Sequence, residues 1–389
     1  MMRMFRVMAR VLMPETTVSG MLRVAAFGVA PLGVVSLVLM PLFLALSHCA
    51  VLAGDANVGT FSIVAFDPVT QELGVAVQSR AFGVGAAVAW AEAGVGAIAT
   101  QASTNESFGP RGLELLRSGR PGSQVLEALL ESDEGREDRQ LAVIDADGNG
   151  VNYTGSRCLD WAGGLVGENF ACQGNILVSE KVVEGMAAAF QKTEGELSEK
   201  LLSALVAAQA AGGDRRGMQS AAILVVRPSD EYPEYNYRYV DLRVEDHTDP
   251  INELIRVYRI HEGSDLLRAH IRYAARYDSL GDEAMAALER SRVGETLMRV
   301  LADENADASL LNNLAWFCAT ADVFIKEAVE AAERAVALDP EDANVLDTLA
   351  EAYFRDGRPG DAVATIKRAI EIDPESSYFR EQLERFEAQ

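Results

Sequence analysis

Three nearly continuous apolar segments in the first half of the chain limit the folds that it can adopt. They span residues 60–67, 73–79 and 94–100. Segments of this length and composition are typical of β-strands, and because apolar and polar residues alternate little, we expect both faces of each strand to be covered. The elements expected next are helices from Gly109 and Gly122, a hairpin at 140–154, a strand at 170–178, helices at 179–192 and 196–211, and strands at 220–227 and 235–244. This order predicts an α+β fold in which two stacked antiparallel sheets lie between helix layers, an αββα sandwich.

The pattern becomes helical after Asp249-Pro250, and part of it repeats. Pro340 and Pro374 are 34 residues apart, which is the period of the tetratricopeptide repeat. The residues that match this repeat are Leu346, Leu349, Ala350, Tyr353, Ala362, Ile366 and Ala369, with an earlier copy at Leu314, Ala315, Ala328 and Ala335. Because two repeats bury little surface alone, we expect the helices of residues 251–301 to pack beneath them.

The N-terminal segment has the features of a leader. A short basic head at Met21-Leu-Arg23 precedes residues 24–47, which carry no charge, and small residues then follow. This pattern predicts export to the periplasm or the extracellular space, with two alternatives for the leader, a cleaved signal or a retained membrane anchor. The expected domains are a leader at 1–56, the sandwich at 57–262 and the helical repeat domain at 263–389.

Overall charge and the rare residue types restrict the classes of function. The formal net charge of −23 would repel nucleic acids and anionic lipids, so we expect neither as a partner, and contact with a membrane only through the leader. The four histidines show no spacing typical of a zinc hydrolase, and no cofactor or metal is expected. Cys158 and Cys172 either pair in an oxidising compartment or remain buried thiols.

Gly59 and Thr60 stand at the start of the first expected strand and provide the best candidate for catalysis. If the chain is cut before Thr60, its hydroxyl becomes a nucleophile and its own α-amine, with a pKa of about 8, becomes the base. Such a mechanism needs no histidine. The alternative is that Thr60 is an ordinary β-branched residue that begins a strand.

Polar residues at the ends of other expected strands and helices are candidates for the rest of the site. Asn175 is a candidate oxyanion donor, and Asp214 is a candidate to hold the amine of Thr60. An arginine at position 80 suits a substrate carboxylate. The candidates for substrate binding are Ser79, Arg80, Gln101, Arg215, Gln219 and Ser220. The alternative for each is a structural role in a turn, a cap or a local ion pair.

Several strings of residues occur together as they do in one known family. They are TFSIVAFD at 60–67, GVAVQSR at 74–80, GVGAIATQ at 94–101, GPRG at 109–112, QGN at 173–175 and GGDRRG at 212–217. Together they resemble the bacterial family known as domain of unknown function 1028. The resemblance covers residues 60 to about 262 and implies the αββα fold of amino-terminal-nucleophile hydrolases, but it implies no substrate.

Two features of this chain differ from the proteasome-type members of the amino-terminal-nucleophile hydrolases. Those proteins carry an Asp-Ser-Arg-Ala string after the second strand, and here Ser79-Arg80-Ala81 matches while Gln78 replaces the acid. Their catalytic lysine also has no counterpart, because the first lysine of this chain is Lys181.

Three functions are compatible with these patterns. The first is an exported amidohydrolase that acts on small amides or peptide-like compounds and binds a protein partner through its repeats. The second is a non-catalytic exported module whose function lies in the repeats. The third is a structural protein that forms homo-oligomers through its sheets and tail.

Overall fold

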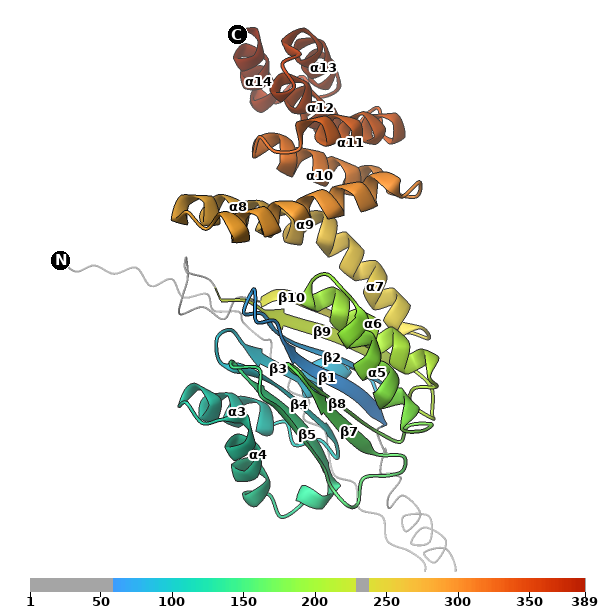
Figure 1. Ribbon diagram of the computed structural model, residues 1–389. Helices are drawn as coiled ribbons and strands as arrows, with labels where there is room; N and C mark the ends of the chain where they lie inside the picture. The colour runs from blue at the N-terminus through green and yellow to red at the C-terminus, as the bar shows by residue number, and fades with distance from the viewer. Residues whose placement is uncertain (1–58, 229–237, 389) are drawn as a thin grey trace, which may run out of the picture. The chain divides into compact units, whose positions relative to one another are not determined.

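The computed structural model of the protein describes residues 59–228 and 238–388, and its first part is a sandwich of two antiparallel sheets (Figure 1). One sheet has the order β10-β9-β2-β1-β8-β7 and contains β1 (Thr60–Phe66), β2 (Leu73–Ser79), β7 (Gly163–Gly167), β8 (Phe170–Asn175), β9 (Ser220–Val226) and β10 (Arg238–Val244). The other has the order β3-β4-β5-β6 and contains β3 (Ala89–Glu92), β4 (Gly96–Ala102), β5 (Arg139–Asp145) and β6 (Gly150–Thr154).

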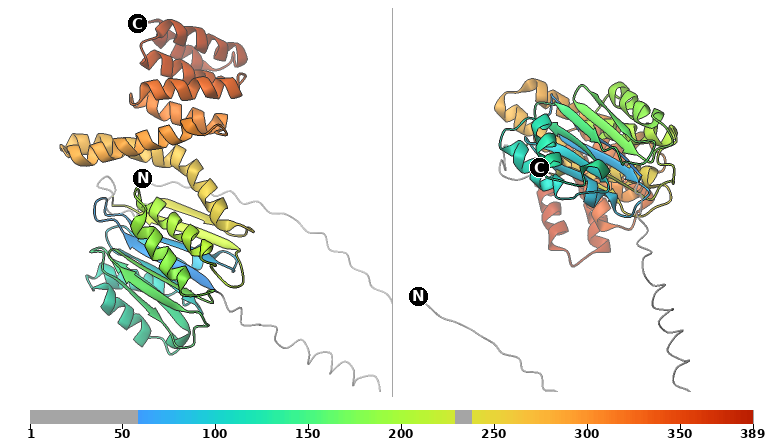
Figure 2. Two further views of the ribbon diagram at one scale, coloured as in Figure 1. Left: turned by 45° about the vertical axis from the view of Figure 1, so that its right-hand side comes forward. Right: turned by 90° about the horizontal axis from the view of Figure 1, so that it is seen from below.

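A pair of helices covers the outer face of each sheet, as two further views of the ribbon also show (Figure 2). Helices α5 (Lys181–Lys192) and α6 (Leu197–Ala210) pack on the sheet that contains β1. Helices α3 (Phe108–Arg117) and α4 (Gly122–Glu131) pack on the sheet that contains β4. The predicted αββα sandwich is therefore confirmed.

Strand β1 is buried on both faces, as its apolar composition predicted. Phe61, Ile63 and Ala65 pack beneath α5 and α6, whereas Val64 and Phe66 face the opposite sheet. Side chains alternate between the two faces of a strand, so Thr60 shares the inter-sheet face with Val64. The first residue of β1 therefore faces the space between the two sheets.

Three short elements had no clear signal in the sequence. Helix α2 (Val84–Val88) has five residues and follows Gly83, whose φ of 65° lies in the left-handed region. Strand β3 has four residues, and β7 has the sequence GGLVG, in which three glycines supply no side chain to pack. Tertiary contacts define these elements more than local propensity does.

The chain after Asp249 is helical, as expected. It contains α7 (Pro250–His261), a π-helical turn η2 (Glu262–Leu266), α8 (Leu267–Leu280), α9 (Glu283–Ala302), α10 (Ala308–Thr320), α11 (Ile325–Leu338), α12 (Ala343–Arg355), α13 (Pro359–Ile372) and α14 (Ser377–Glu387). The matched repeat residues Ala328 and Ala335 are fully buried with α10, and Ile366 and Ala369 are buried with α12 and α14. Thus α10–α11 and α12–α13 form the two expected repeat units.

Several expectations concern residues outside the described ranges. These are the leader at 1–56 and the first residues of the strand expected at 235–244. Within the described residues, Cys158, Cys172 and Cys318 are free thiols, so Cys158 and Cys172 do not pair. None of the helices in residues 59–228 and 238–388 is long and apolar enough to cross a bilayer.

Buried charges join the sandwich to the hairpin of α8 and α9. Arg227, directly after β9, is 1% exposed and pairs with Glu289 of α9 (Nη2–Oε1, 2.6 Å) and Glu72 (Nη1–Oε1, 3.4 Å). The two ring nitrogens of His270, on α8, lie 2.6 Å from Glu289 and 2.8 Å from Glu196. We call the set Glu72, Glu196, Arg227, His270, Glu289 and Arg292 the junction cluster.

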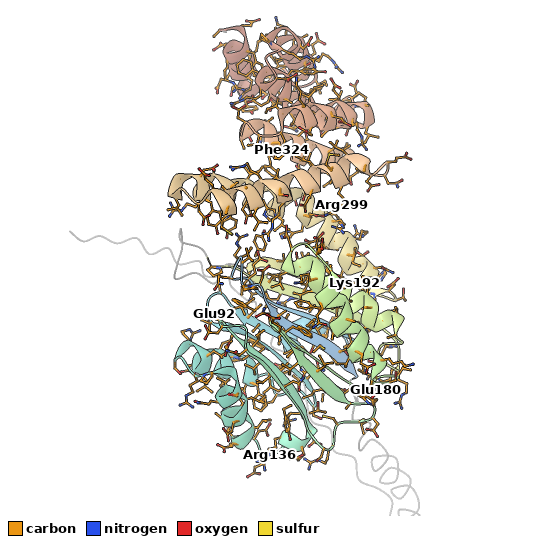
Figure 3. The ribbon with its side chains drawn as sticks, viewed as in Figure 1. Glu92, Arg136, Glu180, Lys192, Arg299 and Phe324 are labelled. Atoms are coloured by element: carbon orange, nitrogen blue, oxygen red, sulfur yellow. The ribbon has the colours of Figure 1, made fainter. Side chains whose placement is uncertain are left out.

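Arg299 forms two further ion pairs and is itself more exposed than the arginines of the junction cluster. Arg299 of α9, labelled in Figure 3, pairs with Glu199 of α6 (Nη2–Oε1, 3.1 Å) and with Glu262 of η2. Ion pairs that are partly exposed contribute little to the free energy of unfolding. Removal of one partner from a fully buried pair is more costly, because it leaves an uncompensated charge in the interior. Loss of one partner in the junction cluster should therefore cost more than loss of one partner at Arg299.

The pKa values in the junction cluster follow from burial and pairing. Burial alone would lower the pKa of His270, but Glu196 and Glu289 outweigh this effect and raise it to about 9. Burial would raise the pKa of Glu196, but His270 and Arg292 lower it to about 2. For Glu72 burial dominates over Arg292 and Arg227 and raises the pKa to about 7.

Replacement of Glu289 by alanine should destabilise the protein strongly. Arg227 and His270 would lose a carboxylate partner while they remain buried, which costs roughly 3–5 kcal/mol. The matched control is Asp278→Ala, which breaks an exposed pair with Arg290 (Nη1–Oδ2, 2.7 Å) and should cost less than about 1 kcal/mol. Urea unfolding of both variants measures the difference, and equal losses would contradict the assignment.

The free energy of unfolding should fall as the pH rises through the titration of His270. The pKa of this histidine is about 9 in the folded chain and 6.5 when unperturbed, so its contribution is complete below pH 6.5 and is lost between pH 6.5 and 9. The loss is about 3 kcal/mol from the size of the shift. Urea unfolding at pH 6 and pH 9.5 should show this decline in the wild type and a smaller one in His270→Gln. An equal decline in the free energy of unfolding for the two proteins would contradict this role of His270.

Candidate active site

Polar side chains gather at one end of the space between the two sheets. The pairing register sets Thr60 of β1 opposite Ser79 of β2 on one side and Asn175 of β8 on the other. Each of these side chains is at most 2% exposed. The remaining members, all fully buried, are Ser62, Gln101, Gln140 and Gln173. Hydrogen bonds join these residues into one network, except Gln173, whose Nε2 donates to the carbonyl of Ala99 (3.0 Å).

The Thr60 hydroxyl is connected to the carbonyl group that precedes it. Thr60 Oγ1 donates a hydrogen bond to Ser79 Oγ (3.0 Å), and Ser79 Oγ donates to the carbonyl oxygen of Gly59 (2.6 Å). Arg216 Nη2 donates to the same oxygen (2.8 Å). Two donors, one of them charged, therefore polarise the carbonyl of the Gly59–Thr60 peptide bond.

Asp214 fixes the position of Arg216 and limits the residue at position 59. Its carboxylate is fully buried and accepts hydrogen bonds from Arg216 N (2.9 Å), Nε (3.1 Å) and Nη2 (2.7 Å) and from Arg80 N (3.2 Å). A Cβ atom on Gly59 would lie 2.8 Å from three atoms of this carboxylate. Because four donors hold the carboxylate in place, only glycine fits before Thr60 without a shift.

Glutamines from the second sheet support Thr60 from the other side. Gln101 Nε2 donates to the carbonyl oxygen of Thr60 (3.3 Å) and to Gln140 Oε1 (2.7 Å), while Gln101 Oε1 accepts from Ser62 Oγ (2.7 Å). Asn175 Nδ2 donates to Gln140 Oε1 (2.9 Å), so the amide of Asn175 is engaged in this network. The donors on the Gly59 carbonyl are instead Ser79 and Arg216.

The other predicted site residues surround the same strand ends. Gln219 N donates to the carbonyl of Ser79 (3.0 Å), and Gln219 Oε1 accepts from Arg80 Nη1 (2.7 Å). Ser220 Oγ donates to the carbonyl of Ala81 (2.5 Å) and thereby holds the loop after β2. Arg215 donates from Nη2 to the carbonyls of Asp160 (2.7 Å) and Leu177 (3.2 Å). The sequence candidates thus form one neighbourhood around Thr60, with Ser220 in a supporting position.

Gln78 and Lys181 lie away from this neighbourhood. Gln78 pairs in register with Phe61 of β1 and Ala221 of β9, and both belong to the core beneath α5 and α6. Neighbours in register point to the same face, so Gln78 is on the helix side of the sheet and Thr60 is on the other. Lys181 begins helix α5 and is exposed. The cation beside Gly59 and Thr60 is Arg216.

Sequence reasoning did not select Ser62, Gln140 or Arg216 as site residues. Ser62 stands two positions after Thr60 in a strand and must share its face. Gln140 begins an apolar run, and a fully buried glutamine in such a run is itself a signal. Arg216 had no separate signal, because only the fold distinguishes it from Arg215.

Two family models match parts of the chain. The model of the family of unknown function DUF1028 matches residues 60–254, and a tetratricopeptide-repeat model matches residues 325–383. No curated protein matches the chain. A solved DUF1028 protein from Silicibacter pomeroyi is 33% identical, covers 54% of this chain and 91% of its own length, and has a TM-score of 0.49. The tetratricopeptide domain of Sgt2 from Aspergillus fumigatus is 25% identical, covers 30% of this chain and 77% of its own length, and has a TM-score of 0.23.

Replacement of Asp214 by asparagine should destabilise the protein and loosen Arg216. The NH₂ group of the new amide would face N–H donors that now bond a buried carboxylate, so some of these hydrogen bonds would be lost. We expect the free energy of unfolding to fall by roughly 2–3 kcal/mol. The matched control is Asp241→Asn. Asp241 also pairs with arginine side chains, those of Arg238 and Arg243, but it is 22% exposed, so this variant should lose less than about 1 kcal/mol. Thermal and urea unfolding compare the two variants, and a similar small effect in both would refute the role given to Asp214.

Proposed function

The chain belongs to the family of unknown function DUF1028, and we propose that it is a hydrolase that uses Thr60 as an amino-terminal nucleophile. Its substrates are small or peptide-like amides. The observation that carries the proposal is the arrangement around the Gly59–Thr60 bond. There the hydroxyl of Thr60 contacts Ser79, and Ser79 and Arg216 both donate to the Gly59 carbonyl.

Release of Thr60 precedes catalysis, and the same groups support its release. Attack of Thr60 Oγ1 on the carbonyl carbon of Gly59 forms an ester and breaks the C–N bond, which leaves the amine of Thr60 free. Water then hydrolyses the ester to a carboxylate on Gly59 and a hydroxyl on Thr60. The donors from Ser79 and Arg216 stabilise the negative charge that develops on the carbonyl oxygen. Removal of an export signal followed by trimming gives the same mature end.

The released residue then carries both a nucleophile and a base. The α-amine of Thr60, with an ordinary pKa of about 8, accepts the proton of the hydroxyl as the hydroxyl attacks an amide carbonyl. The leaving amine takes that proton, and water clears the acyl group from Thr60. The position that the Gly59 carbonyl oxygen vacates lies within reach of Ser79 and Arg216 and suits the oxyanion of the substrate.

Two arginines favour substrates that carry a carboxylate. Arg80 follows Ser79, and its guanidinium donates to Gln219; Arg215 follows Asp214 and donates to backbone carbonyls. In residues 59–228 and 238–388, neither guanidinium has an ion-pair partner. A substrate carboxylate beside the scissile amide would be the negatively charged partner of one of these guanidinium groups and would accept two parallel hydrogen bonds from it.

In this proposal the enzyme is exported and acts next to a protein partner. Residues 1–56 direct export and are removed or retained as an anchor, which explains why residues precede Thr60. Tetratricopeptide repeats are modules that bind proteins, and here they form the C-terminal part of the chain. The repeats would bring the hydrolase to its partner.

Thr60→Ala should abolish hydrolysis, by about a thousandfold or more, because the nucleophile is lost. Thr60→Ser is the matched variant and should retain measurable activity, since the hydroxyl and the amine remain. The assay profiles small amides with and without a free carboxylate, and intact-mass analysis of protein from the native host locates the mature N-terminus at Thr60. Arg80→Gln should raise KM for the carboxylate-bearing amides and leave the neutral ones unchanged.

Three results would reject the proposal. A mature chain that begins well before Thr60 has no free amine at this residue. Equal activity of Thr60→Ala and the wild type removes Thr60 from the mechanism. Absence of any hydrolysis by a chain that does begin at Thr60 favours the non-catalytic module whose function lies in the repeats.

A further inference from the structure

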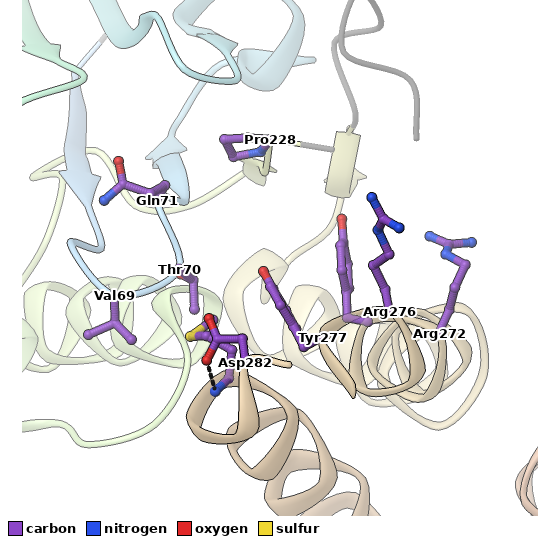
Figure 4. A pocket seen from close by; sticks show the side chains of 10 residues that line it. Val69, Thr70, Gln71, Pro228, Arg272, Arg276, Tyr277 and Asp282 are labelled. Atoms are coloured by element: carbon purple, nitrogen blue, oxygen red, sulfur yellow. Dashed lines mark hydrogen bonds between the residues drawn. The ribbon is translucent and has the colours of Figure 1, made fainter. Parts of the chain in front are cut away.

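A cavity lies at the end of β1 that is opposite Thr60. It has a volume of about 650 Å³, which is in the range of small-molecule sites. Its walls are the β1–β2 turn at 69–71, Pro228 after β9, helix α8 and the beginning of α9 (Figure 4). Strand β1 has seven residues, so the cavity is about 20 Å from Thr60 by the rise of an extended strand.

One wall of the cavity is aromatic and is backed by a cation. The rings of Tyr273 and Tyr277 stack with their centroids 6.3 Å apart and their planes at 24°. Arg227 lies over the ring of Tyr273, 4.0 Å from its centroid, and its Nη2 donates to the hydroxyl of Tyr277 (3.4 Å). This stacking limits the motion of both rings and gives a rigid surface on which a planar group can pack. The apolar side chains beside it are Val69, Pro228 and Met285.

The charged groups at the cavity favour an anion. Arg276 lines it, and in residues 59–228 and 238–388 its guanidinium has no hydrogen bond or ion pair. Figure 4 shows Arg272 and Arg276 extending from α8 on the same side as Tyr277. Asp282 is the acid at the cavity, and its Oδ1 accepts the N-cap hydrogen bond from Met285 N (3.1 Å). Arg276 therefore offers a cation to an anionic group, in a chain whose net charge is −23.

A buried hydroxyl at the cavity wall also lacks a partner. Thr70 is 5% exposed and lines the cavity, and its Oγ1 has no hydrogen-bond partner in the described part of the chain. Buried hydroxyls are nearly always bonded to protein, water or a ligand. The hydroxyl oxygen is itself buried, so this residue contributes to the wall of the cavity rather than to contact with a ligand.

We propose that this cavity binds a small organic carboxylate that carries a planar apolar ring. The ring packs against Tyr273 and Tyr277, and the carboxylate pairs with Arg276. The site is separate from Thr60, so the proposal does not depend on the hydrolase activity. A neutral ligand of the same shape would make the apolar contacts and forgo the charged one.

The test uses the full-length mature chain and two probes that differ in charge, 3-phenylpropionate and 3-phenylpropanamide. Ligand-observed NMR titration should show saturable binding of the acid and binding of the amide that is about tenfold weaker, the effect of one charge-assisted hydrogen bond. Arg276→Gln should weaken the acid about tenfold and leave the amide unchanged. Arg276→Lys, which retains the positive charge, should lose less affinity for the acid than Arg276→Gln does.

A matched variant separates this cavity from the site at Thr60. Because Arg80 is the proposed carboxylate ligand beside Thr60, Arg80→Gln should leave the affinity for 3-phenylpropionate unchanged. Loss of binding in Arg80→Gln but not in Arg276→Gln would assign the probe to Thr60 and overturn the proposal. Equal affinities for acid and amide, or no saturable binding of either, would overturn it as well.

Discussion

The register of β1 against β2 and β8 determines both the core of the sandwich and its polar end. In the observed register Thr60 lies opposite Ser79 and Asn175, and Phe61 lies under α5 and α6. A shift by one residue would exchange the two faces of the strand, bury Thr60 under the helices and insert Phe61 among the glutamines. The apolar residues that hold β1 in the core therefore also hold the candidate nucleophile in position.

The junction cluster shows a second constraint of the same kind. Arg227, at the end of β9, is buried by helices that come later in the chain, and it needs Glu289 from α9 and Glu72 from the β1–β2 loop. Buried ion pairs contribute little net stability against apolar residues of the same size, but they penalise an incorrect arrangement. We interpret the cluster as a device that allows α8 and α9 to dock on the sandwich in one register. The same aromatic rings that contact Arg227 form the wall of the cavity.

The sequence predicted the elements with strong local patterns and missed relations that arise only in space. The strands around Thr60 are nearly continuous apolar segments, and the repeat unit that ends at Pro374 has a period of 34 residues. Both patterns are visible in the sequence. Strand β7, with the sequence GGLVG, is held by its pairing with β8 and has no such pattern. Likewise Gln140 comes from the second sheet and reaches Thr60 through Gln101, so no sequence spacing relates them. Only the stacking of the sheets brings these residues together.

The absence of the acid and the lysine found in proteasome-type proteins carries less weight once side-chain directions are known. Gln78, which replaces the acid in the sequence string, lies on the helix side of the sheet and does not contact Thr60. Asp214, from a distant loop, provides a fully buried carboxylate next to Gly59, and Arg216 provides a cation on its carbonyl. Chemistry depends on which groups meet at the site, and here a different pair of residues supplies an acid and a cation at Thr60.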